Sequence, residues 1–459
     1  MKTLIRHATL VNEGNTFKGG VLVDGERISA IYTEETAIPS EVLATSQVTD
    51  ASGCLLIPGV IDSHVHFREP GLTDKADIAS ESRAALAGGV TTFFDMPNTR
   101  PQTTTLQAWQ AKMDRAAETS LANYAFYLGA TAGNLSELDQ ADYTRVPAVK
   151  LFLGSSTGNM LVSDDQALSD LFRWAAGRGV PVAAHCESEP LIQARRARFL
   201  ATEGADGDLP VSCHSLIRNA DVCYESSARA VESAARAGAR LHLLHVSTQA
   251  ELSLLDRRPL GAGKRLTAET CPHYLWFCQD DYDRVGRRAG NPAYLKCNPA
   301  VKTTADRTAL RRALADGRID TLGTDHAPHL PQDKLGGALR AASGMPSVQF
   351  ALPLMLELVE QGTLSLETLV EKMCHAPAIL YGIPDRGFLR VGMKADLVLL
   401  RRETWPVTPA DVVSPCGWTP YAGETLHYKV AETYVNGHRA YRDGCFSPTS
   451  AARAVLFER

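Results

Sequence analysis

The sequence predicts an α/β fold: a (β/α)8 barrel of the TIM type, with a small β-sandwich formed by the N- and C-terminal segments. Three observations point to this fold. Short apolar, β-rich runs recur along the chain, and segments with helical spacing of Leu and Ala follow them. Metal-binding or titratable side chains come at the ends of several of these runs, which is where such a barrel carries its chemistry. Both ends of the chain contain short alternating strands instead.

A doubly wound open sheet is the competing architecture for alternating strands and helices. No glycine-rich dinucleotide motif follows the first strand-like run, which weakens this alternative. At 459 residues the chain exceeds one typical domain, yet a barrel can take up most of it as one unit. We therefore expect the barrel over residues 56–385.

Residues 1–55 and 386–459 are predicted to form the two parts of the β-sandwich. The first part contains TLIRHATLV and GGVLVDGERISAIY, with a tight turn at Asp24-Gly25. The second part contains ADLVLLRR and HYKVAETYVNGHRAYRDG, with a turn at Asn436-Gly437. We expect strands of the two parts to pair with one another. Irregular extensions are the alternative, and the regular alternation argues against them.

Composition and charge exclude several classes of protein. The net charge is −5 with both signs spread along the chain, and no basic patch indicates a nucleic acid partner. No apolar run approaches membrane-spanning length, and MKTLIRHATLVNEG is too polar after Ile5 for a signal peptide. Ten cysteines form neither a CxxC array nor a small secreted framework. We expect a cytoplasmic protein with reduced thiols and no membrane partner.

The most informative motif is PGVIDSHVHFREPG, residues 58–71. It places His64 and His66 two residues apart after an apolar run. Alternate side chains of a strand point the same way, so both imidazoles can face one cavity. Two convergent imidazoles suit a borderline metal such as zinc. A pair this close is more often coincidental when it stands alone, so the interpretation depends on further ligands downstream.

Four further candidates follow short apolar, β-rich runs, in the chain order Lys150, His185, His245 and Asp325. Each has a simpler structural interpretation. Most lysines are surface groups, His185 could be a core histidine, and Asp325 could cap the helix that follows. His242 competes with His245, because both lie in LHLLH and the period of two places them on opposite faces.

A second set of residues suggests that an anion binds at the same place. Arg68 lies two residues beyond His66, on the same face if the strand continues. Metal ions repel a guanidinium, so we interpret Arg68 as the holder of an anion, and its fork matches a carboxylate. The remaining candidates for this pocket are Asn98, Asn298 and His329. The alternatives are an ion pair of Arg68 with Glu69 or Asp74 and a turn position for Asn98.

These motifs resemble the amidohydrolase superfamily and, within it, the dihydroorotases. The likeness runs from the N-terminal segment to GMKADLVLL near the C-terminus. It implies two Zn²⁺ ions with these ligands: His64 and His66 for the more buried ion, His185 and His245 for the second, and Lys150, carboxylated on its amine by CO2, as the bridge. Some dihydroorotases carry aspartate at the bridging position, so the lysine marks a subtype. Asp325 would ligate metal and shuttle a proton.

The resemblance also implies a reaction. In dihydroorotases the positions matching Arg68, Asn98 and His329 hold the substrate carboxylate, and the position matching Asn298 contacts the ring. The expected activity is the reversible hydrolysis and cyclisation between dihydroorotate and N-carbamoyl-L-aspartate, a step of de novo pyrimidine (UMP) biosynthesis. A metal-bound hydroxide would be the nucleophile, with Asp325 as proton shuttle. Dimers or tetramers are common in the family, which is consistent with a homo-oligomer.

Two alternatives stay open. ETCPHYLWF, residues 269–277, is as similar to allantoinases as to typical dihydroorotases, and Ser347 and Gln349 stand where many dihydroorotases have glycine and glutamate. An allantoinase or hydantoinase-like cyclic amidase is therefore the enzymatic alternative, although Arg68 and the REPG run favour dihydroorotase. The other alternative is a non-catalytic scaffold that partners a carbamoyltransferase. Such scaffolds usually lose metal ligands, whereas this chain has a candidate for every position.

Overall fold

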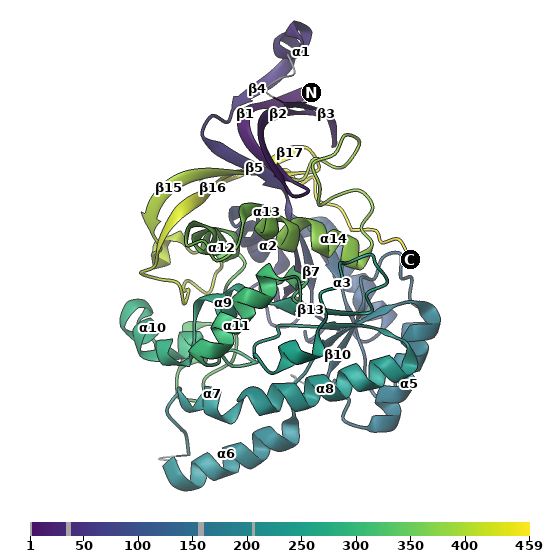
Figure 1. Cartoon of the computed structure of the whole chain (residues 1–459), viewed down its shortest axis with the longest axis vertical. Helices are drawn as coiled ribbons and strands as arrows, with labels where there is room; N and C mark the ends of the chain where they lie inside the picture. Colours follow the sequence, from purple (N-terminus) through teal and green to yellow (C-terminus); the bar gives the residue numbers. More distant parts are fainter. Residues whose placement is uncertain (1, 34–37, 155–159, 204–206) are drawn as a thin grey trace.

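The computed structural model describes residues 2–33, 38–154, 160–203 and 207–459. Figure 1 shows a barrel surrounded by helices in the lower part of the molecule and a β-rich region above it. The barrel strands are β6 (Val60–Val65), β7 (Val90–Asp95), β8 (Asn123–Phe126), β9 (Leu128–Gly129), β10 (Val149–Phe152), β11 (Pro181–His185), β12 (Arg240–Leu243), β13 (Leu266–Thr270) and β14 (Thr321–Leu322).

All of these strands pair in parallel, in the order of the sequence. β6, β7 and β8 form one sheet, and β9 to β14 form another. Only Tyr127 separates β8 from β9, so the two are halves of one interrupted strand. At the other edges, Val65 forms a parallel bridge with His326, and the His66 N–H donates to the His326 carbonyl at 2.7 Å. Eight strand positions thus follow one circle, which confirms the predicted barrel.

Helices follow the strands and cover the barrel: α2 (Ile78–Ala87), α3 (Leu106–Thr119), α4 (Leu135–Asp139), α5 (Asp165–Arg178), α6 (Glu189–Glu203), α7 (Cys213–Ile217), α8 (Ala220–Ala237), α9 (Pro272–Trp276), α10 (Tyr282–Ala289), α11 (Thr304–Ala315), α12 (Ala351–Glu360), α13 (Leu366–Val370) and α14 (Ala376–Tyr381). The sequence explains α5 well. Asp164 caps its first turn through the Ala167 N–H, and Gly179 ends it in a left-handed conformation. Its buried side chains are Leu168, Leu171, Phe172 and Ala175, the spacing of one helical face. Among the described residues no helix is long and apolar enough to cross a membrane.

The β-sandwich contains strands from both ends of the chain: β1 (Lys2–Asn12), β2 (Asn15–Asp24), β3 (Arg27–Thr33), β4 (Ser46–Asp50), β5 (Cys54–Pro58), β15 (Leu397–Pro406), β16 (Thr425–Val435), β17 (His438–Arg442) and β18 (Cys445–Phe446). A short helix, α1 (Ser40–Thr45), precedes β4. β5 pairs with β1 on one side and with β15 on the other, so the two ends share one hydrogen-bonded sheet. This confirms the expected pairing between the two ends.

The sandwich has its own core and is directly continuous with the barrel. Val21 and Ile28 from the N-terminal strands and Leu397 and Tyr434 from the C-terminal strands belong to one buried cluster. Only Gly59 separates β5 from β6. A Cβ atom on this glycine would lie 2.1 Å from Thr91 Oγ1, so a larger residue does not fit at the junction. The predicted domain limits, residues 1–55, 56–385 and 386–459, stay a prediction.

Candidate active site

One cavity of about 140 Å³ lies at the carboxyl ends of the barrel strands. The ten residues singled out in the sequence all line it: His64, His66, Arg68, Asn98, Lys150, His185, His245, Asn298, Asp325 and His329. Four residues that the sequence analysis did not single out complete the lining: Phe152, Ala327, Ser343 and Gly344. The barrel thus brings together predicted site residues as far apart in the chain as His64 and His329, which are separated by 265 positions.

Three acceptor atoms converge at the base of this cavity. The Nε2 atoms of His64 and His66 lie 3.3 and 3.0 Å from Asp325 Oδ1. The other ring nitrogens are already occupied, because His64 Nδ1 donates to Glu269 Oε1 at 2.8 Å and His66 Nδ1 donates to Asn98 Oδ1 at 2.7 Å. Both Nε2 atoms therefore present lone pairs toward a carboxylate. These acceptors repel one another unless a cation lies between them, and all three ligand atoms fall within 4.8 Å of one another.

The second pair of histidines lies beside the first. His185 Nδ1 and His245 Nε2 approach to 2.8 Å, and the His64 and His245 ring centres are 5.3 Å apart. His242, the competing candidate, is buried outside the cavity and contacts Thr267 Oγ1 at 2.9 Å through its Nδ1. The opposite-face argument from the sequence agrees with this arrangement.

Lys150 lies inside the protein, with 1% of its surface exposed. Its Nζ atom lies 4.5 Å from the centre of the Phe152 ring, and no carboxylate of the described chain forms an ion pair with it. Burial lowers the pKa of Lys150 from 10.5 to about 7. A large fraction of the amine is therefore neutral near pH 7, and the simpler interpretation as a surface lysine does not hold.

Electrostatics favours metal binding by these groups. Burial lowers the pKa of His66 to about 4 and also lowers the pKa values of His185 and His245, which favours the neutral form of these three imidazoles. Burial alone would raise the pKa of Asp325, but a proton on His64 or His66 in the metal-free site, which His66 Nε2 can donate to Asp325 Oδ1 at 3.0 Å, holds that pKa below its ordinary value, so the carboxylate is charged. Neutral imidazoles and a charged carboxylate are the ligand forms that a divalent ion such as zinc requires. The donor set fits such an ion.

Three residues of the cavity have left-handed backbone conformations. The φ angles are 71° for Arg68, 40° for His245 and 47° for Asp325. Left-handed conformations are uncommon for residues other than glycine and often occur at functional sites. Strand β6 ends at Val65, so Arg68 does not continue the strand alternation as the sequence suggested. The left-handed turn, and not the strand period, brings its side chain into the cavity.

The guanidinium of Arg68 forms one wall of the cavity. Its Nε donates to the Pro328 carbonyl at 2.9 Å, and one terminal nitrogen lies 3.0 Å from His329 Nε2. No carboxylate of the described residues lies within 4 Å of the group. Glu69, a proposed partner, pairs with Arg115 at 2.7 Å instead. Arg68 is thus a buried cation beside the cavity without an acidic partner in the described chain.

Sequence reasoning missed the residues that orient the ligands. Glu269 accepts hydrogen bonds from both His64 and Ser63, and it is fully buried. Its position at the start of ETCPHY, inside the strand-like run LTAET, was the available signal, because a buried carboxylate requires partners. Two departures from the family pattern, Ser347 and Gln349, lie outside the cavity lining. Ser347 donates to the Thr324 carbonyl at 2.9 Å and thereby supports the segment next to Asp325.

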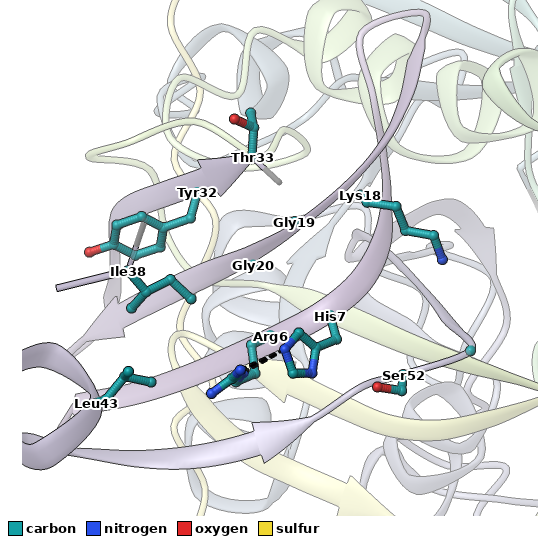
Figure 2. Close-up of a pocket in the computed structure, with 11 residues that line it drawn as sticks. Arg6, His7, Lys18, Gly19, Gly20, Tyr32, Thr33, Ile38, Leu43 and Ser52 are labelled. Atoms are coloured by element: carbon teal, nitrogen blue, oxygen red, sulfur yellow. Dashed lines mark hydrogen bonds between the residues drawn. The ribbon is translucent and has the colours of Figure 1, made fainter. Parts of the chain in front are cut away.

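A larger hollow, about 520 Å³, lies on the β-sandwich. Figure 2 shows its lining, with the neighbouring side chains of Arg6 and His7 joined by a hydrogen bond of 2.9 Å. His7 also contacts Asp50 at 3.1 Å, so these polar groups already have partners. The residues that line this hollow include no carboxylate. The smaller cavity in the barrel is therefore the candidate active site.

Comparisons with known proteins agree with this site. Residues 55–440 match the amidohydrolase family. A dihydroorotase of Halobacterium salinarum is 35% identical over 88% of this chain and 89% of its own. An allantoinase of Deinococcus radiodurans is 33% identical over 98% of each chain. The solved structure of an L-hydantoinase from Arthrobacter aurescens covers 99% of both chains with a TM-score of 0.90 and 29% identity. The chain belongs to the amidohydrolase family and is a cyclic amidase within it.

Proposed function

We propose that this cyclic amidase is a zinc-dependent dihydroorotase, which interconverts dihydroorotate and N-carbamoyl-L-aspartate. The observation that supports this choice most directly is Arg68, a buried guanidinium in the cavity wall without an acidic partner among the described residues. A buried charge is costly unless it is paired, so the site favours a substrate that brings its own carboxylate. Dihydroorotate carries a carboxylate on its ring. Allantoin and the parent hydantoin ring do not.

The other residues of the wall complete an anion site. His329 contacts Arg68 and also lies 3.0 Å from the Ser343 carbonyl. Asn98 uses its oxygen to accept from His66, which leaves its NH2 group for the substrate. Asn298 lines the same cavity and is assigned to the substrate ring. In this proposal Arg68, Asn98 and His329 hold the carboxylate, and their contacts fix the ring relative to Asp325.

We assign the metal ligands as His64, His66, Lys150, His185, His245 and Asp325, for two Zn²⁺ ions. The neutral fraction of the Lys150 amine can attack CO2, which forms a carbamate and releases a proton, and Lys150 would then offer the metal an anionic ligand in place of an ammonium group. Zinc held by these residues would supply Lewis-acid polarisation of the scissile carbonyl and a water molecule of lowered pKa. Glu269 and Asn98 hold the His64 and His66 rings in the orientation that this requires.

Asp325 is the proposed proton shuttle. Its carboxylate is charged and lies within 3.3 Å of both His64 and His66. It can accept a proton from the attacking water and return it to the amide nitrogen that leaves when the ring opens. In the cyclisation direction the same proton moves from the carbamoyl nitrogen to Asp325. The bond between that nitrogen and the side-chain carbonyl carbon forms as water leaves.

Allantoinase or hydantoinase activity is the second candidate, because the similarity to the allantoinase of D. radiodurans extends over nearly the whole chain. The substrate would then lack a ring carboxylate, and Arg68 would need another role. The dihydroorotase proposal also places the enzyme in de novo pyrimidine synthesis in the cytoplasm. All ten cysteines are free thiols, which agrees with a reducing compartment.

The test is turnover of dihydroorotate, allantoin and hydantoin by purified protein, with metal analysis of the same sample. Dihydroorotate turnover with about two zinc ions per chain would support the proposal. A clear preference for allantoin or hydantoin would refute it in favour of the second candidate. Neither metal nor turnover after reconstitution with zinc and bicarbonate would favour a non-catalytic scaffold.

A further inference from the structure

The long connection between β11 and α8 places a buried histidine directly behind the active-site wall. α7 (Cys213–Ile217) lies in this connection, and His214 on α7 is only 4% exposed. Its Nε2 atom lies 2.9 Å from the Cys297 carbonyl oxygen and 3.0 Å from Asn298 Oδ1. His214 does not line the cavity. It therefore lies behind Asn298, a residue of the proposed substrate site.

These contacts determine the protonation of the His214 ring. A carbonyl oxygen can only accept a hydrogen bond, so Nε2 must carry the proton that points at Cys297. Burial lowers the pKa of His214 well below its usual value, with Lys296 and Arg218 nearby, so the ring is neutral with a single N–H. The backbone of Cys297 thus selects the Nε2–H tautomer.

The tautomer in turn determines which end of the Asn298 amide faces His214. When His214 Nε2 carries the proton, the Asn298 amide oxygen can accept a hydrogen bond from it. A rotated amide would instead point its NH2 group at the Nε2–H group, and two donors cannot form a hydrogen bond with each other. No described residue accepts a hydrogen bond from Asn298 Nδ2. The NH2 group is therefore the part of the amide that remains for the cavity.

We propose that His214 is a positioning residue that holds Asn298 with its NH2 group toward the substrate, so that Asn298 serves only as a hydrogen-bond donor. This inference rests on the proposed function and refines its substrate class. Asn98 is held in the same way, since its oxygen accepts from His66. With Arg68, the substrate wall then offers donors at three places. This wall favours a substrate whose hydrogen-bond acceptors lie opposite these donors. In dihydroorotate these acceptors are the carboxylate and the carbonyl oxygens of the ring.

The surrounding structure holds His214 in place. Cys213 and Ile217 of α7 belong to a buried cluster with Ile192 of α6. Arg195 of α6 donates to the Leu216 carbonyl at 3.0 Å, which ties the two helices together. Arg195 is one of three clustered arginines on α6, with Arg196 and Arg198. Arg195 therefore fixes α7 against α6.

The first test compares two substitutions of His214. His214→Gln keeps a nitrogen donor near the Nε2 position, whereas the shorter His214→Asn cannot reach Asn298. Loss of one hydrogen bond to the substrate should raise KM for dihydroorotate about 5- to 10-fold in His214→Asn. kcat should change less than about 3-fold, and His214→Gln should lie within about 3-fold of wild type in both. Equal KM values for the two variants would overturn the proposal.

A double-mutant cycle separates positioning from a general structural effect. If His214 acts through Asn298, then His214→Asn should add no further loss in an Asn298→Ala background. Additive losses would mean that His214 supports the fold or acts elsewhere, and would refute the positioning role. Zinc content and urea midpoints of all four proteins provide the control for folding.

The cycle also distinguishes failure of this inference from failure of the proposed function. If the wild type hydrolyses allantoin or hydantoin but not dihydroorotate, the proposed function is wrong. The double-mutant cycle can then be repeated on the substrate that is hydrolysed, because each of these rings carries carbonyl acceptors. Crystal structures at about 1.2 Å resolution or better, or neutron structures, distinguish the amide oxygen from the nitrogen and give a readout that needs no turnover. The Asn298 side chain should keep its orientation in His214→Gln and change it, or take two orientations, in His214→Asn. An unchanged Asn298 in His214→Asn would overturn the inference.

Discussion

Replacing Arg68 with methionine tests the carboxylate site directly. The guanidinium is 8% exposed, and its Nε is fixed by the Pro328 carbonyl at 2.9 Å. A guanidinium has five N–H donors, so several remain for the two oxygens of a substrate carboxylate. Methionine keeps most of the apolar side-chain volume and removes the charge. The variant should therefore fold and bind zinc as the wild type does.

The expected loss follows from the burial of the group. Removing one partner of a buried, hydrogen-bonded charge pair costs about 2–5 kcal/mol in binding. This corresponds to a loss of about 30- to 5,000-fold in kcat/KM for dihydroorotate, mainly through KM. The loss should stay near the lower end if neighbouring cations such as Lys75, whose Nζ lies 3.1 Å from His329 Nδ1, partly replace the guanidinium.

The assay measures kcat/KM for dihydroorotate and for dihydrouracil, which has the same ring without the carboxylate. Wild type should prefer dihydroorotate strongly, and Arg68→Met should reduce that preference without reducing dihydrouracil turnover. Arg115→Met is the matched control, because Arg115 pairs with Glu69 and does not line the cavity. An equal loss on both substrates, or no loss on dihydroorotate, would refute the carboxylate site.

Three further predictions concern the metal site and the loop beside it. Asp325→Asn should lower kcat by about 100- to 10,000-fold with little change in the thermal midpoint, as measured by steady-state kinetics and calorimetry. Glu269→Gln should weaken zinc binding about 10- to 100-fold in competition with a chelator, because His64 loses its charged acceptor. Partial burial raises the pKa of Asp208, but hydrogen bonds from the N–H groups of Gly337 and neighbouring residues have the larger, opposite effect. The net pKa of Asp208 is therefore below its ordinary value of 3.8. In urea titrations, Asp208→Asn should therefore cost about 1–3 kcal/mol above about pH 5, and the difference should shrink as the pH falls below 3.8, because the wild-type carboxylate is then protonated. The first prediction is contradicted if Asp325→Asn leaves kcat unchanged, and the second if Glu269→Gln leaves the zinc affinity unchanged. The third is contradicted if the stability difference of Asp208→Asn does not depend on pH.

The sequence was informative wherever local pattern and global fold agree. The apolar run before His185 is a buried parallel strand that ends at this residue, as predicted, whereas Lys150 lies within its strand, Val149–Phe152, and not after it; both side chains line the cavity. The alternation near both termini predicted strands that pair, and β5 joins β1 and β15 as this required. In each case the spacing of apolar residues, or one turn motif such as Asn436-Gly437, was enough to predict the strand.

The sequence was less informative where a side chain depends on distant partners. Arg68 enters the cavity through a left-handed turn after the strand, which no period of two predicts. His214 and Asn298 are 84 positions apart, and only the fold shows their contact. Glu269 is separated from His64 by more than 200 residues, so no local pattern indicates their hydrogen bond. Such contacts are tertiary, and sequence spacing says nothing about them.

The residues of the cavity with left-handed backbone conformations need support from the surrounding structure. The residues that provide this support belong to the site although they do not line the cavity. Each such conformation costs about 1–3 kcal/mol and persists only where neighbouring bonds impose it. Next to Arg68, the Phe67 N–H donates to Asp95 at 2.7 Å, and next to Asp325, the His326 N–H donates to Thr324 Oγ1 at 3.1 Å. Asp95 and Thr324 do not line the cavity, yet they fix the backbone on which Arg68 and Asp325 depend. Changes at these two buried positions should therefore displace the anion site and the proton shuttle without removing either side chain.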